Sequence, residues 1–264
     1  MTTILDLILK EKKKEVERFK EEKIEIPEQP SEKKASLLKK LQSEEELAII
    51  AEFKRASPSK GDINIGLNPE TQALSYIDFG ADAISVLTDT PFFKGGFDDL
   101  KAVRETVDAP LLCKDFIIDE VQILKAKASG ANLILLIVAA LEEQRLKELY
   151  SFAIGNGLEV LMEVHSEDEL ETALRTGAQI IGVNNRDLKT FSVDLAMTEM
   201  LAPKIKAAGA YLISESGIQT EQDVQRVIEA GANGILVGEA FMRAENLEAL
   251  LKQMKQPLKE VLKK

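Results

Sequence analysis

The segment GANLILLIV, residues 130–138, joins a Gly-Ala pair to six consecutive apolar residues. A glycine just past a helix end supplies the left-handed backbone conformation that terminates the helix. A continuous apolar run of this length is typical of a parallel strand that is covered by helices on one face and by a core on the other. The segment therefore predicts the end of a helix followed directly by a buried strand.

The same pattern recurs along the chain. Gly-Ala pairs also precede apolar runs at residues 80–81, 177–178, 209–210 and 231–232, and Gly157 takes the same place ahead of another run. Together with the first run after the N-terminal segment and a run at 111–116, these predict eight strands. They lie at 47–53, 83–88, 111–116, 133–138, 159–165, 180–184, 211–215 and 234–237. Eight alternating β/α units predict a closed α/β barrel, the (β/α)8 TIM fold, and a doubly wound open sheet is the alternative.

Helix starts between the strands are marked by capping residues. Asn68-Pro69, Asp119 with Gln122, Ser166 with Glu169, and Thr220 with Asp223 each place a cap before an amphipathic segment. Before the first strand, residues 1–45 predict a Lys- and Glu-rich helix at 3–23, a linker with Pro27 and Pro30, and a short helix at 33–41. We interpret 1–264 as one barrel domain whose N-terminal extension packs on the barrel and covers part of its mouth. We interpret the charge run of the first helix as a solvated face.

The composition limits the possible functions. The 264 residues carry a net charge of −11, which disfavours nucleic acid and anionic membranes as partners but not a small anionic substrate. The chain contains one histidine and one cysteine, too few for a zinc cluster or a disulfide framework. No apolar run could span a bilayer, and the N-terminal residues lack the apolar core of a signal peptide. We expect a cytoplasmic protein and a monomer.

Ionisable residues gather at the predicted strand ends, where barrels place their catalytic groups. Because side chains alternate along a strand, Glu52 and Lys54 share one face, and Lys114, Glu163 and Glu215 are expected to face the same mouth. An ion-pair network that only fills the barrel is the alternative for this set. Alternation directs His165 to the same face of its strand as Glu163, but we favour for it a role in supporting a site residue rather than in contacting substrate. Cys113 points to the opposite face of its strand from Lys114, and we assign it no role in the site.

Two glycines follow the last two strands, in SGI at 216–218 and VGE at 237–239. Loops at these two positions commonly bind phosphate through backbone N–H groups in such barrels. The small and polar loop at 55–61 is typical of a mobile active-site loop, with a plain connector as the alternative.

With these residues in place, the sequence closely resembles the indole-3-glycerol phosphate synthases. The stretches that carry the resemblance are AEFKRASPSKG (51–61), SVLTD (85–89), FFKGG (92–96), LCKDFIID (112–119), LMEVHSEDEL (161–170), IGVNNRDL (181–188), SESGI (214–218) and LVGEAFMR (236–243). They cover the ends of all predicted strands but the fourth, in order. The resemblance implies ring closure, decarboxylation and dehydration of 1-(2-carboxyphenylamino)-1-deoxyribulose 5-phosphate to indole-3-glycerol phosphate, with no metal or organic cofactor.

The resemblance also implies a role for each site residue. The catalytic residues would be Lys114 as the general acid, Glu163 as the general base, and Lys54 and Glu52. Lys54 would bind phosphate or carboxylate and act as a second acid, while Glu52 would orient the lysines and assist proton transfer. Asn184, Arg186, Glu215 and Ser216 would hold substrate, Gly217, Gly238 and Glu239 would offer backbone contacts to phosphate, and Phe93, Phe116, Leu135, Leu161 and Leu188 would wall the anthranilate ring. The alternatives are a catalytically silent phosphate-binding barrel and a phosphoribosyl-amine isomerase.

Overall fold

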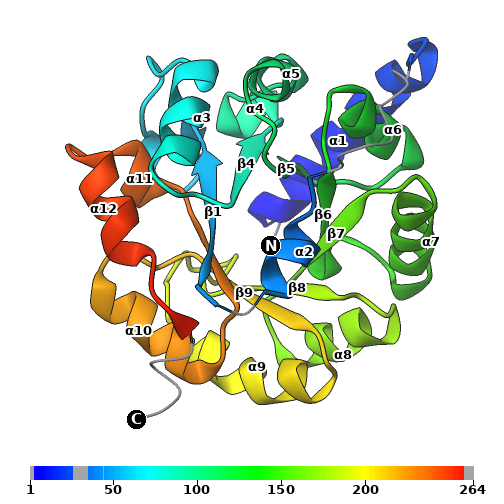
Figure 1. Ribbon diagram of the computed structural model, residues 1–264. Helices are drawn as coiled ribbons and strands as arrows, with labels where there is room; N and C mark the ends of the chain where they lie inside the picture. Colours follow the sequence, from blue (N-terminus) through cyan, green and yellow to red (C-terminus); the bar gives the residue numbers. More distant parts are fainter. Residues whose placement is uncertain (1–2, 26–34, 44, 259–264) are drawn as a thin grey trace.

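A computed structural model of the chain describes residues 3–25, 35–43 and 45–258. Eight parallel strands close into a barrel in the order β1-β10-β9-β8-β7-β6-β5-β4 (Figure 1). They are β1 (Ala48–Phe53), β4 (Ala83–Leu87), β5 (Leu111–Lys114), β6 (Leu133–Ile137), β7 (Glu159–Val164), β8 (Ile180–Asn184), β9 (Tyr211–Glu215) and β10 (Gly234–Val237). The closed barrel confirms the predicted fold and excludes the open sheet.

Helices surround the barrel and alternate with its strands. They are α3 (Pro69–Asp78), α4 (Thr90–Phe93), α5 (Phe97–Thr106), α6 (Glu120–Ala128), α7 (Glu143–Gly155), α8 (Glu167–Arg175), α9 (Ala196–Ala207), α10 (Glu221–Ala230), α11 (Glu239–Met242), α12 (Leu247–Met254) and the 3-10 turn η1 (Val138–Ala140). Complete capping boxes open α6 and α10, as predicted. None of the described helices is long and apolar enough to cross a membrane.

The strands separate two hydrophobic cores because their side chains alternate in direction. The outer core packs the strands against the helices and includes Ile49, Ile84 and Cys113. The inner core fills the barrel, with Ile50, Leu112 and Leu161 among its members. Inward parity is therefore confirmed for the strand positions on which the sequence prediction of the site depends.

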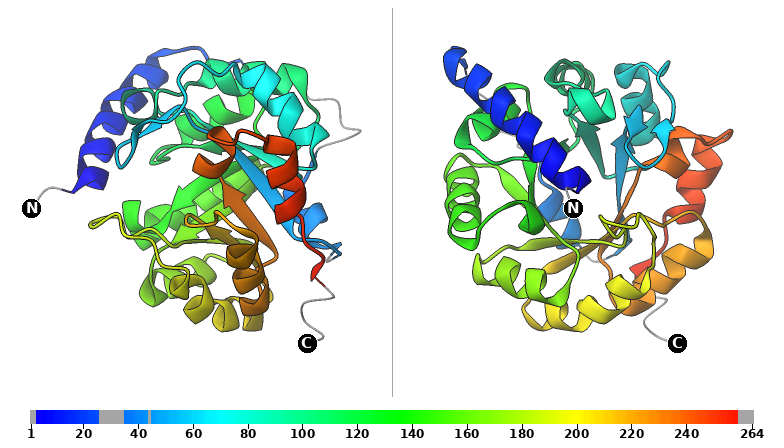
Figure 2. Two further views of the ribbon diagram at one scale, coloured as in Figure 1. Left: turned by 90° about the vertical axis from the view of Figure 1, so that its left-hand side faces the viewer. Right: turned by 180° about the vertical axis from the view of Figure 1, so that it is seen from behind.

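Helix α1 (Ile4–Glu21) crosses one end of the barrel, and α2 (Leu37–Leu41) covers the other (Figures 1 and 2). The prediction that the charges of the first helix form a solvated face is wrong for Lys12 and Glu15, which are buried. The Nζ atom of Lys12 lies 3.0 Å from an oxygen of Asp89 and 2.6 Å from one of Asp115. These buried ion pairs fasten α1 to the ends of β4 and β5.

Helix α2 closes the end of the barrel opposite to α1. Its Leu37 and Leu41 side chains belong to the inner core. The carboxylate of Glu159, at the start of β7, accepts hydrogen bonds from the backbone N–H groups of Leu37 and Leu38 at 3.0 and 3.1 Å. This caps a helix that begins four residues later than predicted; Lys33 itself, like Pro27 and Pro30 of the predicted linker, lies outside the described residues. A carboxylate at a helix N-terminus is favourable because it meets unsatisfied N–H donors.

Candidate active site

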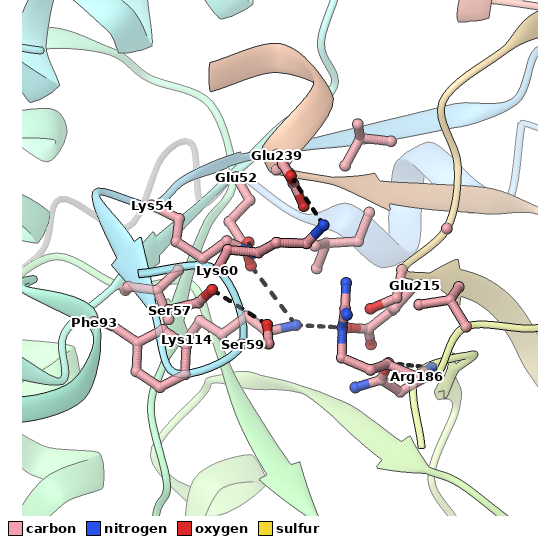
Figure 3. A pocket seen from close by; sticks show the side chains of 18 of the residues that line it. Glu52, Lys54, Ser57, Ser59, Lys60, Phe93, Lys114, Arg186, Glu215 and Glu239 are labelled. Carbon is pink, nitrogen blue, oxygen red and sulfur yellow. Dashed lines mark hydrogen bonds and ion pairs between the residues drawn. The ribbon is translucent and has the colours of Figure 1, made fainter. Parts of the chain in front are cut away.

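A cavity of about 1010 Å³ opens at the carboxyl ends of the strands (Figure 3). The residues predicted for the site that line it are Glu52, Lys54, Phe93, Lys114, Phe116, Leu135, Glu163, Asn184, Arg186, Leu188, Glu215, Ser216, Gly217, Gly238 and Glu239. Ile4, Leu5 and Ile8 of α1 line it as well, which confirms that the extension covers part of the mouth. The fold thus brings together strand ends that are far apart in the sequence.

Lys114, the last residue of β5, lies at the centre of the charged cluster. Its Nζ atom is 2.5 Å from an oxygen of Glu215, 3.6 Å from one of Glu163 and 3.9 Å from one of Glu52. All three carboxylates are almost fully buried, and Lys114 keeps 14% of its side chain exposed toward the cavity. A single ammonium group is therefore shared by three strands of the barrel.

The second lysine of the cluster follows β1. The Lys54 Nζ atom lies 2.5 Å from Glu52, whose side chain stands between the two lysines. Room for this carboxylate comes from Gly238, since a Cβ atom at that position would meet Glu52 Oε1 at 2.4 Å. Gly238 thus has a steric function besides its predicted contact with phosphate.

Glu163, on β7, is held by two polar neighbours. Asn184 donates to it from Nδ2 at 3.2 Å, and the His165 Nε2 atom lies 3.3 Å from the same oxygen. On its other side His165 Nδ1 is 3.2 Å from Glu169. Because His165 touches Glu163 and is not among the residues lining the cavity, the structure agrees with a supporting role.

The charges of the cluster shift one another's pKa values. Burial alone would lower the pKa of Lys114, but Glu215, Glu163 and Glu52 raise it, so the ammonium keeps its proton at neutral pH. Burial would raise the pKa of Glu163, but Lys114 and His165 hold it below its usual value. Burial and the nearby carboxylates raise the pKa of Glu215 to about 7. The carboxylates outnumber the two lysines, and Glu215 is the one that takes up a proton most easily.

Aromatic and apolar side chains form one wall of the cavity. The rings of Phe93 and Phe116 are 5.9 Å apart between centroids, and Leu135 and Leu188 line the same cavity. Leu161, predicted as part of this wall, does not line it and is fully buried in the inner core. Leu161 points inward like Glu163, two residues further along β7, but it lies deeper in the barrel, below the cavity.

The loops after β9 and β10 shape a second, polar wall. Ser216 and Gly217 have positive φ angles of 66° and 85°, so the chain turns sharply after β9. Such a conformation in a non-glycine residue is uncommon and is concentrated at functional sites. Glu239 begins α11, and its carboxylate lies 3.5 Å from Lys60 and 3.6 Å from Arg243. These two cations offset the negative charge of Glu239.

The loop at residues 55–61 is part of a short hairpin. Its strands are β2 (Ala56–Ser57) and β3 (Gly61–Asp62), and Ser57, Ser59 and Lys60 line the cavity. The Arg186 side chain, on the opposite rim, also lines the cavity and donates to the backbone oxygen of Phe191 at 3.2 Å.

The sequence prediction missed two residues whose side chains hold parts of the site in place. Asn185, which is buried, donates from Nδ2 to the backbone oxygens of Glu215 and Ser216 at 2.9 and 3.1 Å and so holds the turn after β9. A polar residue of outward parity at a strand end was the available signal. The second missed residue is Arg243, whose side chain lies beside Glu239. The only signal for it in the sequence was its spacing of four residues from Glu239, which places the two on one face of a helix. Within the described ranges, no group of three or more His, Cys, Asp or Glu residues is arranged to hold a metal ion.

Comparison with known proteins identifies relatives across nearly the whole chain. The family model described as indole-3-glycerol phosphate synthase matches residues 5–254. Indole-3-glycerol phosphate synthases from Bacillus cereus (strain G9842) and Bacillus anthracis (strain CDC 684 / NRRL 3495) are each 50% identical over 255 residues, which cover 97% of this chain and 99% of the relative.

A solved structure shares the fold at much lower identity. Thiamine phosphate pyrophosphorylase from Pyrococcus furiosus matches with a TM-score of 0.59 at 20% identity, over 86% of this chain and all of that one. This likeness concerns the barrel alone, whereas the family match rests on sequence over nearly the full length. The chain belongs to the indole-3-glycerol phosphate synthase family.

Proposed function

We propose that the chain converts 1-(2-carboxyphenylamino)-1-deoxyribulose 5-phosphate into indole-3-glycerol phosphate, carbon dioxide and water. The observation that carries the proposal is the Lys114 ammonium, which contacts Glu52, Glu163 and Glu215 at the floor of the cavity. Such a cation suits a reaction in which a ketone oxygen gains negative charge as a carbon–carbon bond forms.

Ring closure requires an acid at the carbonyl oxygen. The aromatic carbon that bears the carboxylate attacks the ribulose ketone, and Lys114 gives its proton to the oxygen as the new bond forms. The intermediate then loses carbon dioxide, and the electron pair of the broken bond restores the aromatic ring. Lys114 is suited to this step because its carboxylate neighbours keep it protonated until the substrate oxygen accepts the proton.

Dehydration requires a base and an acid. We assign Glu163 as the base, since Asn184 and His165 fix its carboxylate beside Lys114. We assign Lys54 as the acid that protonates the departing hydroxyl, since Glu52 contacts both lysines and so links Lys54 to Lys114. Glu52 thereby orients the pair.

The remaining lining residues are assigned to binding. Phe93 and Phe116, with Leu135 and Leu188, would enclose the anthranilate ring. The backbone N–H groups of Gly217, Gly238 and Glu239 would bind the phosphate with Lys54, and Asn184, Arg186, Glu215 and Ser216 would hold the substrate chain. We propose that the chain acts as a monomer in the cytoplasm, where its sole cysteine, Cys113, stays reduced.

The proposal is tested by mixing the purified protein with the anthranilate-derived substrate and following indole fluorescence. The chain contains no tryptophan, so the product signal has a low background. We expect fluorescence to rise together with release of one carbon dioxide per product. Binding without turnover would instead indicate a silent binding protein, and a changed sugar without carbon dioxide release would indicate an isomerase. The mass of the protein in solution, measured by analytical ultracentrifugation of the same preparation, tests whether it is a monomer.

A further inference from the structure

Lys12 of α1 is buried among carboxylates at the edge of the active site. Its side chain is 2% exposed, and its Nζ atom lies 2.6 Å from Asp115, 2.7 Å from Glu15 and 3.0 Å from Asp89. None of these four residues belongs to the charged cluster around Lys114. A lysine is rarely buried to this extent unless it is paired, so the arrangement calls for a specific role.

Asp115 fixes the backbone on both sides of its own position. It lies between Lys114 and Phe116 in the chain and accepts hydrogen bonds from Thr88 Oγ1 at 2.6 Å and from the Phe116 N–H at 2.7 Å. The Thr88 N–H in turn donates to the Lys114 backbone oxygen at 3.2 Å. The orientation of Lys114 therefore depends on a carboxylate that Lys12 neutralises.

Asp89 fixes the neighbouring loop. Its side chain accepts from the Phe92 N–H at 2.8 Å and so caps α4, the short helix that ends at Phe93. Phe93 and Phe116 pack against each other in the cavity wall. One ammonium group from the N-terminal extension thus joins the two loops that carry Lys114 and both aromatic rings.

Without this cation the two loops would hold adjacent buried carboxylates that no other lysine or arginine among the described residues neutralises. Asp89 and Asp115 are 0% and 1% exposed, so water could not take over the role of Lys12. Removing one partner of such a pair is strongly unfavourable because a buried charge remains uncompensated. The loops would then relax, since the carboxylates would turn away from each other.

We propose that Lys12 is a positioning residue for ring closure: it holds the ends of β4 and β5 in register so that Lys114 and the aromatic wall meet the substrate correctly. The inference rests on the proposed function. It goes beyond the covering of the mouth by α1, since Ile4, Leu5 and Ile8 already supply that cover. Its consequence is that Lys12 affects the chemical step and not only substrate affinity.

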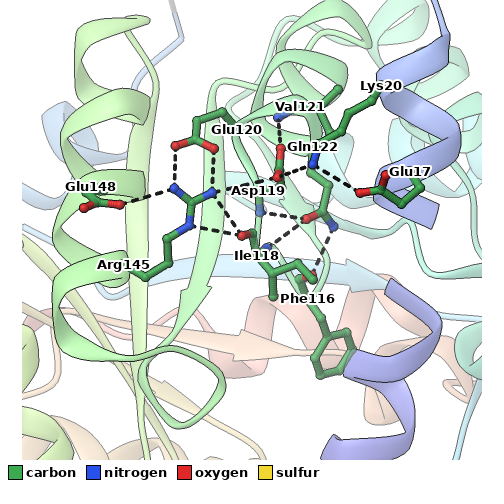
Figure 4. A network of polar contacts seen from close by, with 10 residues as sticks. All are labelled: Glu17, Lys20, Phe116, Ile118, Asp119, Glu120, Val121, Gln122, Arg145 and Glu148. Carbon is green, nitrogen blue, oxygen red and sulfur yellow. Dashed lines mark hydrogen bonds and ion pairs between the residues drawn. The ribbon is translucent and has the colours of Figure 1, made fainter. Parts of the chain in front are cut away.

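The same helix offers a matched control in Lys20. This residue also pairs with an aspartate of the barrel, since its Nζ atom lies 3.1 Å from Asp119 (Figure 4). Its side chain is 48% exposed, and Asp119 lies near Arg145 as well. An exposed ion pair of this kind contributes little, so Lys20→Met changes the charge and the helix without disturbing a buried cluster.

The test compares Lys12→Met with Lys20→Met in steady-state turnover and in direct binding of substrate. Lys12→Met should lower kcat more than tenfold and change the Kd less than threefold, because mispositioning of Lys114 weakens the transition-state interaction. Lys20→Met should keep both values within about twofold. If Lys12→Met raised the Kd and left kcat unchanged, Lys12 would serve only to anchor the helix and the proposal would be overturned.

A second variant tests the contacts that link Asp115 to Lys114 without changing any residue of α1. Thr88→Val removes one hydrogen bond to Asp115 and keeps the shape of the side chain. It should lower kcat about threefold to tenfold at unchanged Kd, less than the full value of a charge-assisted hydrogen bond, because Asp115 acts on Lys114 only through the backbone. If Lys12→Met failed to fold, an unchanged kcat in Thr88→Val would overturn the proposal.

Amide hydrogen exchange separates this inference from the proposed function. The Phe116 N–H should exchange faster in Lys12→Met than in wild type or Lys20→Met, because its acceptor Asp115 is released. If wild type formed no indole product, the proposed function would fail, whereas exchange would still report whether Lys12 holds the loops. Unchanged exchange at Phe116 would show that Lys12 does not hold them.

Discussion

The two ends of the barrel interior are built from equivalent inward positions and filled in opposite ways. At the end closed by α2, Leu37 and Leu41 pack against apolar strand residues such as Ala48 and Leu133. At the end under α1, the inward positions two to four residues further along the strands carry Glu52, Lys114, Glu163 and Glu215. Apolar packing stabilises the first end, whereas the second accumulates buried charge.

The two ends therefore contribute differently to the stability of the barrel. Burying apolar surface is favourable, but burying ionised groups costs free energy unless they are well paired. Burial, together with the excess of carboxylates around Lys114, raises the pKa of Glu215 to about 7, a sign that the pairing is incomplete. Substitutions at the two ends should therefore separate activity from stability.

The largest effect is expected for Lys114→Met at the charged end. It removes the proton donor and the positive charge while keeping a similar length. We expect kcat to fall about 10³-fold and the Kd for substrate to stay within about tenfold, because the interaction is made mainly in the transition state. Single-turnover kinetics with direct binding separates the two, and Lys39→Met on α2, at the other end, should behave as wild type. Weak binding with normal turnover at saturation would move the acid role to Lys54.

The next effect is expected at the apolar end for Leu37→Ala. Leu37 is fully buried in the inner core, and truncating such a leucine costs about 2–5 kcal/mol. Urea unfolding should show this loss, while kcat at 25 °C stays within about twofold because the cavity lies at the opposite end. A comparable loss of kcat in a folded Leu37→Ala would break the separation between the two ends.

A pair of glycines allows the same substitution at both ends. A Cβ atom at Gly182 would meet Glu215 Oε1 at 2.1 Å, whereas one at Gly234 would meet the Ala48 backbone oxygen and Ile213 Cδ1 at 2.8 Å. Gly182→Ala should therefore lower kcat/KM about tenfold or more by displacing Glu215. Gly234→Ala should lower the free energy of unfolding by about 1–3 kcal/mol and leave kcat unchanged. Equal effects of the two variants on both quantities would contradict the comparison.

The smallest effect is a pH dependence at His165. Burial would lower its pKa, but Glu163 and Glu169 raise it to about 10 from an ordinary value near 6.5. A raised pKa means that the folded state binds the proton more tightly, so this stabilisation is fully present below pH 6.5 and is lost as the pH rises through 10. The Tm difference between wild type and His165→Gln should shrink from pH 6 to pH 10. A constant difference would show that the imidazolium contributes nothing through its charge.

Much of the fold and of the site could be predicted from the sequence because both depend on local patterns. Glycine at a helix end and an apolar run after it are local features: six of the eight strands follow such a glycine, and β1 and β5 lie at apolar runs without one. Alternation along each strand was sufficient to predict that Lys114 and Glu163 face the same mouth of the barrel. Depth was not predictable in this way: Leu161 points inward as expected but lies below the cavity, since depth depends on the tilt and stagger of the strands.

The rest depends on contacts between distant residues. No local pattern marks which lysine of the first helix is buried, because the partners of Lys12 are Asp89 and Asp115 on strand ends far along the chain. The Ser166 cap of α8 is a smaller example of a contact that the local pattern did not predict in full. The backbone N–H of Glu169 donates to Ser166 as predicted, but the Glu169 carboxylate binds His165 instead of completing a capping box.

The attachment of α1 has a consequence for protein synthesis. The ribosome makes Lys12 roughly 100 residues before Asp115, so the helix emerges long before its docking site and a long loop must close when it binds. Until then the face that carries Ile8, Val16 and Phe19, all buried in the folded chain, stays uncovered. Domains fold as they leave the ribosome, and uncovered apolar surface favours aggregation at that stage. The alternation of Lys and Glu along the rest of α1 keeps this early segment soluble while the barrel is still being made.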